Sequence, residues 1–195
     1  MATASVVRRG AGSRREAILD EAAKLFAERG FRAVGVDDIG ASVGISGPGI
    51  YRHFPSKDSM LAEMLVRISE RLLAEGTSRL DAAPDPRAAL DALIGWHIEF
   101  ALANPALIVV QDRDLANVAE PDRRRVRRLQ RRYVEVWVGV LRRLDPGRTE
   151  QASRAAAHAV FGLLNSTPHS AHALPRHDMA ALLHRMAMAA LLGCD

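Results

Sequence analysis

The chain has 195 residues, 48% of them hydrophobic, so it is long enough and apolar enough to bury a core. Lys and Arg (27) outnumber Asp and Glu (23), and a net charge of +4 does not by itself establish a nucleic-acid partner. The only cysteine is Cys194, which excludes a disulfide framework and a cysteine-based zinc site. No apolar run is long enough to cross a bilayer, and residues 1–12 lack the apolar core of a secretory signal, so we expect a cytoplasmic protein without membrane contact.

The N-terminal part predicts an arm followed by two helices. Residues 1–12 are rich in Ala, Gly, Ser and Arg and are expected to form a flexible basic arm. A first helix is predicted from Ser13, which can form a capping box with Glu16, to Gly30, which is suited to end it. A second helix is predicted over 36–43, where two aspartates in the first turn complement the helix dipole.

A tight turn and a third short helix follow. Gly44 ends the second helix, and Ser46 can cap a third that runs to about His53. Pro48 is tolerated there because the first turn needs no intrahelical N–H donor, and Pro55 ends the helix. Helix, short helix, tight turn and short helix is the layout that places one helix in the DNA major groove.

Every later segment spaces its apolar residues as a helix does, and no strand is predicted. The expected helices cover 57–83, 87–103, 106–115, 121–144, 149–164 and 178–192, with a polar loop over 165–177. The clearest break is Pro84-Asp85-Pro86. The predicted fold class is therefore all-α, with a three-helix helix-turn-helix domain over 13–57 and a helical effector-binding and dimerisation domain over 58–195.

The first third of the chain carries an ordered series of motifs. They are Gly30-Phe31, Val36-Asp37-Asp38-Ile39-Gly40, Gly44-Ile45-Ser46-Gly47-Pro48-Gly49-Ile50-Tyr51-Arg52-His53-Phe54 and Ser56-Lys57. In this order and spacing they resemble the DNA-binding domain of tetracycline-repressor (TetR) family regulators. The resemblance implies a homodimeric repressor that binds a near-palindromic operator on double-stranded DNA and is released by a small effector. Two departures are Val34-Gly35, where the family commonly has Ser or Thr, and Gly49, where Thr is frequent.

The same resemblance implies which residues face DNA. They are Ser46, Gly47, Pro48, Gly49, Tyr51, Arg52, His53 and Lys57. Tyr51, His53 and Lys57 are expected to meet phosphates, whereas Gly47, Pro48 and Arg52 are expected nearer base edges. Arg52 is the candidate for reading a guanine, with DNA shape and backbone contacts supplying the remainder. Four arginines are expected to strengthen DNA binding electrostatically: Arg8, Arg9, Arg14 and Arg15. The alternative is a purely structural helical hairpin.

The family resemblance further implies dimerisation through the last two helices. One small-residue face consists of Ala152, Ala155, Ala156 and Ala159, and a second stripe of Met179, Leu182, Leu183, Met186 and Ala190. The two would suit a four-helix bundle across a two-fold axis. The alternative is that both stripes pack inside one subunit.

Seven residues of the predicted C-terminal domain are candidates to line an effector pocket, because together they offer apolar surface and a few polar side-chain atoms. They are Trp96, His97, Phe100, Gln111, Tyr133, Trp137 and Phe161. This composition suits a small, largely hydrophobic effector fixed by one or two hydrogen bonds, with an acyl thioester, a steroid-like molecule or a drug as candidates. Each residue taken singly also fits as ordinary core.

Two charged or titratable runs allow further interpretations. Seven arginines between Arg123 and Arg132 could hold the phosphates of an acyl-coenzyme A or of DNA, but a solvated helix face is the plainer interpretation. His169, His172 and His177 could bind a metal, but they lack regular spacing on one helix, which favours a polar loop.

Catalysis has little support in the sequence. Only His97 with Glu99 or Asp112 offers a pair of titratable groups. We therefore expect no enzyme activity, no catalytic or metal-binding residues and no cofactor. Two rival functions remain open: a helical small-molecule- or metal-binding protein without DNA affinity, and an enzyme that uses the body cavity.

Overall fold

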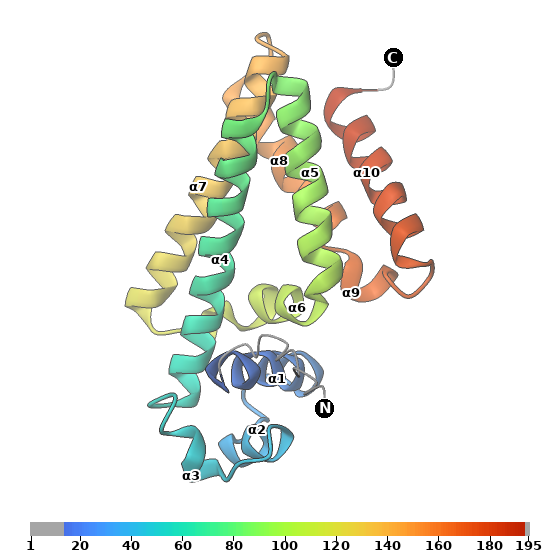
Figure 1. Ribbon diagram of the computed structural model, residues 1–195. Helices are drawn as coiled ribbons and strands as arrows, with labels where there is room; N and C mark the ends of the chain where they lie inside the picture. Colours follow the sequence, from blue (N-terminus) through green and yellow to red (C-terminus); the bar gives the residue numbers. More distant parts are fainter. Residues whose placement is uncertain (1–13, 194–195) are drawn as a thin grey trace, which may run out of the picture.

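The computed structural model describes residues 14–193, and within that range it contains helices and no strand (Figure 1). The elements are α1 (Arg14–Arg29), α2 (Val36–Ser42), α3 (Gly47–Ile50), α4 (Lys57–Ala82), α5 (Pro86–Ala103), α6 (Pro105–Asp114), the 3-10 helix η1 (Leu115–Asn117), α7 (Glu120–Leu144), α8 (Glu150–Leu164), α9 (Thr167–Ser170) and α10 (Arg176–Leu192). The all-α class predicted from the sequence is confirmed. The expected basic arm and the Ser13 cap lie outside the described residues.

The segment from α1 to α3, called the head below (residues 14–56), packs around its own apolar side chains. Ile18, Phe26, Ile39 and Ile50 are fully buried there, which fixes α2 and α3 against α1. Gly30 ends α1 as predicted: its φ of 88° suits glycine, and its N–H donates to the carbonyl of Phe26 over 2.9 Å. These side chains belong to one hydrophobic cluster that continues into the rest of the molecule.

Helix α4 connects the head to the remaining helices, called the body below (residues 57–193). It is capped by Ser56, whose Oγ accepts from the N–H of Ser59 over 3.0 Å. From there it runs the height of the molecule, with Met60 and Leu61 buried near the head and Leu72 buried in the body (Figure 1). In the body α4 packs against α5 and α7, α7 against α8, and α10 against α5 and α8.

Two elements differ from the sequence expectation. The third helix ends at Ile50 rather than His53, and Arg52 and His53 continue as a tighter turn whose N–H groups donate to Gly49 and Ile50. Two glycines and a proline leave this helix little intrinsic stability, which accounts for its length. Part of the expected loop over 165–177 forms α9, because Thr167 is buried and donates to the carbonyl of Ala101 over 3.1 Å.

No single helix within residues 14–193 is both long and apolar enough to cross a membrane. The pair Pro86–Ala103 and Pro105–Asn117 meets the length and composition of a span only when joined across a 90° bend.

Candidate nucleic-acid interface and internal pocket

The helix-turn-helix is held together by close backbone contacts. Gly44 adopts φ +72° in the turn, and the N–H of Ile45 donates to the carbonyl of Gly40 over 2.9 Å. Gly40 is buried so tightly that an added Cβ would lie 2.7 Å from the Ile45 oxygen. Ser46 caps α3 by accepting from the N–H of Gly49 over 3.3 Å. The predicted turn and cap are thus both present, and they fix the direction of the residues that follow.

The end of α3 presents several of the predicted DNA-facing residues on the surface. Tyr51 is 56% exposed, although it is a large aromatic side chain, and Ser46, Pro48 and Arg52 are also exposed. His53 is half-buried beside them. An exposed aromatic with hydrogen-bonding neighbours on a rigid turn is an arrangement suited to contact a large polar partner.

The two glycines of α3 differ in their surroundings. Gly47 is buried, and an added Cβ would lie 1.8 Å from Oδ1 of Asp37 on α2. The absence of a side chain there serves the packing of α2 on α3. At Gly49 the nearest atom to an added Cβ is Oγ of Ser46 at 3.4 Å, so this position has room for a methyl group. Packing explains why residue 47 is a glycine, whereas nothing in the structure explains the glycine at position 49.

Lys57 is directed into the head rather than outward. Its Nζ donates to the carbonyl of Phe31 over 2.8 Å and to that of Val34 over 2.7 Å, and it lies 4.5 Å from the centroid of the Phe31 ring. These contacts hold the loop between α1 and α2 against the start of α4. The ammonium that the sequence assigned to a phosphate is therefore already engaged within the free protein.

Arg15 also forms contacts within the protein, which corrects the expectation that its charge is available to strengthen DNA binding. Its guanidinium forms a two-pronged pair with the carboxylate of Glu63 on α4, with Nε 3.0 Å from Oε1. It also donates to the carbonyl of His53 and lies 4.0 Å from the centroid of the Phe54 ring. Arg14 is exposed, with one bond to the carbonyl of Val43 (3.2 Å). Arg8 and Arg9 lie outside the described residues.

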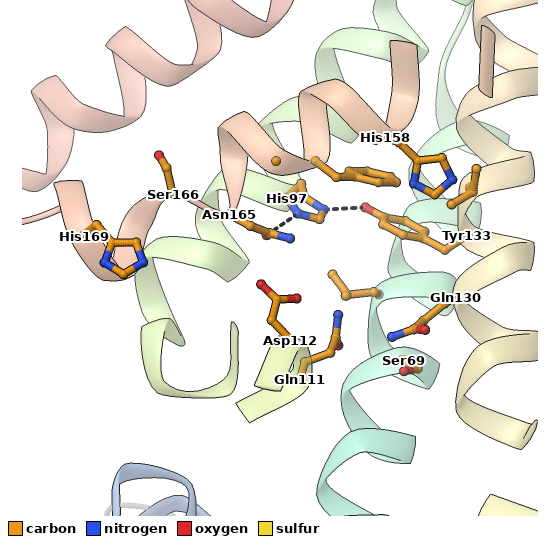
Figure 2. Close-up of a pocket in the computed structure, with 14 residues that line it drawn as sticks. Ser69, His97, Gln111, Asp112, Gln130, Tyr133, His158, Asn165, Ser166 and His169 are labelled. Carbon is orange, nitrogen blue, oxygen red and sulfur yellow. Dashed lines mark hydrogen bonds between the residues drawn. The ribbon is translucent and has the colours of Figure 1, made fainter. Parts of the chain in front are cut away.

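The body contains a pocket of 540 Å³ between α4, α5, α6, α7, α8 and α9 (Figure 2), and three of its lining residues, His158, Gly162 and His169, are exposed. Its lining consists of Ser69, Leu72, His97, Gln111, Asp112, Gln130, Tyr133, Val134, His158, Phe161, Gly162, Asn165, Ser166 and His169. This volume is within the range that holds drug-sized ligands. Ten of the fourteen lining residues carry polar side-chain atoms, although apolar atoms supply most of the lining surface.

Four of the seven predicted lining residues meet in this pocket: His97, Gln111, Tyr133 and Phe161. Trp137 lies behind them, fully buried, with its ring edge-on to Phe161 at 5.0 Å.

Trp96 and Phe100, also predicted to line an effector pocket, do not line this one. They lie on another face of α5: Trp96 faces Arg71 and Arg79 of α4, and Phe100 lines a separate groove next to α1. Helix α5 is apolar over most of its surface, so its hydrophobic pattern does not identify the pocket side.

The sequence analysis missed most of the polar lining. The missed polar residues are Ser69, Gln130, His158, Asn165, Ser166 and His169, and Asp112 was considered only as a catalytic partner. They come from five different elements, and no local spacing connects them. A helix-by-helix search for polar residues on otherwise apolar faces would have found Ser69, which is 2% exposed on α4.

His97 is the centre of the pocket's hydrogen-bond network (Figure 2). Its Nε2 lies 3.0 Å from Oδ1 of Asn165, and its Nδ1 lies 3.3 Å from the hydroxyl of Tyr133. Burial lowers the pKa of His97 to about 4, so the ring is neutral near pH 7. With Nε2–H donating to Asn165, Nδ1 accepts from Tyr133, and burial raises the pKa of that phenol. The ring also stacks on Phe161 at 5.0 Å.

The pocket lining contains one carboxylate and neither lysine nor arginine. Asp112 stands at its α6 side, and partial desolvation raises the pKa of its carboxyl group above the usual value. An anion placed in the pocket would meet this carboxylate without a compensating cation. The lining thus favours uncharged polar groups.

The helix faces expected to dimerise are partly exposed. Ala152, Ala155 and Ala159 lie on the surface of α8, and Met186 is 46% exposed on α10.

Part of the second predicted stripe packs inside the subunit. Met179 and Leu183 are buried between α10 and the body, so the second stripe divides between an inner and an outer face. Helix α10 buries only one of its sides, and its opposite side is exposed.

His97 and Glu99, which were considered as a catalytic pair, do not lie together. That side chain is exposed and lies 3.7 Å from Arg79, away from the pocket. In the described part of the chain no group of three or more His, Cys, Asp or Glu side chains is arranged to hold a metal ion. All three histidines of the 165–177 segment are exposed, and of these only His169 lines the pocket.

The arginine run lies on the outer side of α7, and several of its members form ion pairs. Arg123 and Arg124 pair with Glu120, and Arg125 pairs with Glu70 of α4 over 2.6 Å. The remaining members, Arg127, Arg128, Arg131 and Arg132, lie further along the same helix.

A helical protein with a helix-turn-helix head and a pocketed helical body is the class that this geometry defines. Residues 18–64 match the family model "Bacterial regulatory proteins, tetR family", and residues 83–169 match "Tetracyclin repressor-like, C-terminal domain". The chain belongs to the tetR family, as the sequence predicted.

Known relatives cover much of the chain. The HTH-type transcriptional repressor KstR2 of Rhodococcus jostii (strain RHA1) is 34% identical over 133 residues, which are 68% of this chain and 65% of that protein. The fold is similar to that of PfmR, a TetR family regulator from Thermus thermophilus (TM-score 0.80, 26% identity, 95% of this chain and 99% of that chain). It is also similar to that of the ketosteroid transcriptional regulator KstR2 of Mycobacterium tuberculosis (TM-score 0.78, 24% identity, 94% and 97%).

Proposed function

We propose that this protein is a cytoplasmic transcriptional repressor that binds a near-palindromic operator as a homodimer and is released by a small effector. The observation that carries the proposal is the exposure of Tyr51 and Arg52 at the end of a braced helix-turn-helix, in a chain of the tetR family. The relative that is 34% identical is named a transcriptional repressor, and this supports repression over activation.

We assign the DNA contacts to the surface around α3. Arg52 is the candidate for a two-pronged contact with guanine, and Tyr51 and His53 are candidates for phosphates. Ser46, Gly47, Pro48 and Gly49 would lie against the duplex through backbone and small side chains, so much of the specificity would come from DNA shape. Lys57 would reach a phosphate only by leaving the two carbonyl groups that it now contacts.

Dimerisation is proposed through the outer faces of α8 and α10. Small side chains on α8 allow a partner helix to approach closely, and the exposed Met186 supplies apolar area next to them. A two-fold axis there would present two heads to half-sites separated by about 34–36 Å. The functional boundary that we propose between the DNA-binding and effector-binding parts is at residues 57 and 58, within the first turn of α4.

The effector is proposed to occupy the pocket around His97. It would carry an apolar body and an uncharged hydrogen-bonding group, such as the ketone of a steroid-like molecule or the carbonyl of an acyl thioester, because the lining supplies amides and hydroxyls and no cation. The similarly folded KstR2 of Mycobacterium tuberculosis is a ketosteroid transcriptional regulator, which is compatible with this chemistry. Native mass spectrometry of the purified protein would identify a ligand carried over from the cell.

The decisive experiment measures binding to the DNA upstream of the protein's own coding sequence. Fluorescence anisotropy at several salt concentrations should give a complex that weakens steeply with salt. Arg52→Ala should lose about 1–3 kcal/mol of binding free energy, whereas Arg143→Ala, on the exposed end of α7, should bind as the parent does. A folded protein that forms no salt-sensitive complex would refute the proposal and favour a small-molecule-binding protein without DNA affinity.

A further inference from the structure

Asn165 stands at one end of the hydrogen-bond network around His97. It is the residue at which α8 ends, and its backbone N–H donates to the carbonyl of Phe161 over 2.8 Å, which fixes its place in the pocket wall. Its Oδ1 lies 3.0 Å from Nε2 of His97, so the amide nitrogen is the end of the side chain that points into the pocket (Figure 2). Within residues 14–193 that nitrogen donates to no protein group.

The orientation of the Asn165 amide depends on which ring nitrogen of His97 carries the hydrogen. Burial lowers the pKa of His97 to about 4, so near pH 7 the ring is neutral, and one nitrogen donates while the other accepts. A hydrogen on Nε2 requires the amide oxygen as its acceptor and leaves the amide N–H groups to the pocket. A hydrogen on Nδ1 requires the reverse and leaves the amide oxygen to the pocket. The partner of Nδ1, the hydroxyl of Tyr133 at 3.3 Å, therefore decides what a ligand meets.

Tyr133 donates to His97 because its other polar neighbour cannot accept. That neighbour is Trp137, whose indole N–H is only a donor and whose ring lies edge-on to Tyr133, with centroids 6.2 Å apart. The indole nitrogen is buried and has no acceptor at full hydrogen-bond geometry. Burial raises the pKa of the Tyr133 phenol, and the indole N–H acts in the opposite direction, as a donor close to the phenol oxygen does. The hydrogen of the phenol is thus left for Nδ1 of His97.

Packing holds the rings of Tyr133 and His97 in place. The Tyr133 ring occupies the space beside Gly76 of α4, where an added Cβ would lie 2.6 Å from Cε2 of the ring. Phe161 stacks on both rings, with centroids 5.0 Å from His97 and 5.6 Å from Tyr133. Both side chains are buried. Neither ring can turn away from its hydrogen-bond partner without displacing its neighbours.

We propose that Asn165 is the residue that selects the effector, by presenting its N–H groups to a carbonyl oxygen. Tyr133 and His97 are positioning residues that fix the direction of those groups. This inference rests on the proposed function, because it assigns the group of the effector that the pocket recognises. A carbonyl oxygen accepts without donating, which matches an amide nitrogen that has only hydrogens to offer. Molecules of the same shape without that oxygen leave the donor unsatisfied, which costs free energy.

The tautomer of His97 is the first test, and it needs neither effector nor DNA. In full-length protein with isotopically labelled histidine, nuclear magnetic resonance spectra of the ring nitrogens distinguish a protonated nitrogen from a bare one. The signals of His97 are assigned by their loss in His97→Gln. We expect the hydrogen on Nε2 near pH 7. A hydrogen on Nδ1 would overturn the inference.

Two probes of equal shape test the recognition of a carbonyl group. Acetophenone and α-methylstyrene differ only in that the carbonyl oxygen of the first is a methylene group in the second. Shifts of the pocket resonances during titration give both affinities. The ratio of ketone affinity to alkene affinity is compared between variants, because this comparison cancels the difference in hydrophobicity of the two probes.

The affinity ratio should fall about 5-fold or more in Asn165→Leu, which removes the donor. It should fall further in Asn165→Asp, which keeps the shape of the side chain and turns a carboxylate oxygen toward the ketone. Gln130→Leu removes another amide of the pocket lining and is the matched control, in which the ratio should stay within about 2-fold of the parent. If Asn165→Leu does not fold, Asn165→Asp alone decides.

Tyr133→Phe tests the positioning role, because it keeps the stacked ring and removes the donor to Nδ1. With Asn165 intact, the affinity ratio should still fall about 2-fold or more, and a signal of the Nδ1–H tautomer of His97 should appear. A parental ratio together with a parental tautomer would overturn the role assigned to Tyr133.

A parental affinity ratio in the Asn165 variants would overturn the inference, and so would a parent protein that binds neither probe. These measurements involve no DNA. Salt-sensitive binding of the parent to its upstream DNA would therefore leave the proposed function standing in each of these cases, whereas a folded parent that binds no DNA refutes that function.

Discussion

The guanidinium of Arg15, in the first turn of α1, donates to both carboxylate oxygens of Glu63 in α4. The pair is only partly buried, with the two side chains 36% and 22% exposed. The same guanidinium donates to the carbonyl of His53, so one side chain joins three segments of the chain. The sequence suggested that Arg15 contributes to DNA binding. In the structure its guanidinium instead stabilises the surface that is expected to face DNA.

Arg15→Ala should lower the free energy of unfolding by about 1–2 kcal/mol, because a carboxylate and a carbonyl lose a charged donor at a partly exposed site. Urea denaturation measures this change. Arg14→Ala, which removes one exposed bond to Val43, is the control and should stay within about 0.5 kcal/mol of the parent. Equal stability of the two variants would remove Arg15 from the contacts that hold the head together.

Lys57→Met should destabilise the head without changing the salt dependence of DNA binding. The carbonyls of Phe31 and Val34 lose a charged donor, which costs about 1–3 kcal/mol, while the methionine keeps apolar contact with the Phe31 ring. Thermal unfolding and anisotropy titrations over a salt series measure the two effects separately. A salt slope reduced by about 1, with unchanged stability, would instead place Lys57 on a phosphate.

Two glycines of the helix-turn-helix should respond differently to alanine. Gly40→Ala brings a Cβ within 2.7 Å of a backbone oxygen and should cost about 1–3 kcal/mol of stability through overpacking. Gly49→Ala has room and should leave stability equal or higher by up to about 1 kcal/mol, because alanine favours helix. If Gly49→Ala nevertheless weakens DNA binding, its backbone lies against the duplex. Unchanged affinity would exclude that close approach.

The buried imidazole of His97 should make stability fall with acidification. Its pKa is about 4 when folded and 6.5 as the ordinary value, so between these pH values the unfolded chain binds more protons than the folded one. Stability from this group is complete above pH 6.5 and is lost as pH falls toward 4, by at most about 1.4 kcal/mol per pH unit. Urea titrations of the parent and of His97→Gln should converge toward low pH. His172→Gln, in an exposed turn, should retain the parent's slope.

Ala155→Arg should separate the proposed dimer. An arginine on the exposed face of α8 would place a bulky charge where two helices are proposed to meet, whereas Ala74→Arg on the exposed side of α4 should have no such effect. Sedimentation velocity distinguishes a dimer from the 21.2 kDa chain. A dimer that persists in Ala155→Arg would place the interface elsewhere.

The sequence alone determined the longer helices, the Ser46 cap and the helix-turn-helix, because these depend on residues a few positions apart. Gly30, Gly44 and Ser46 act where the sequence predicted, through backbone conformation and local hydrogen bonds. The same locality explains why the family motif was recognisable before any contact was known.

Only the tertiary structure decided where the long side chains reach and which faces meet across the pocket. Lys57 and Arg15 can extend outward or inward, and carbonyl and carboxylate groups from distant segments attract them inward. On α5 both His97 and Trp96 are buried, but only His97 faces the cavity. The buried part of this helix is so broad that its hydrophobic pattern does not tell the pocket side from the rest of the core.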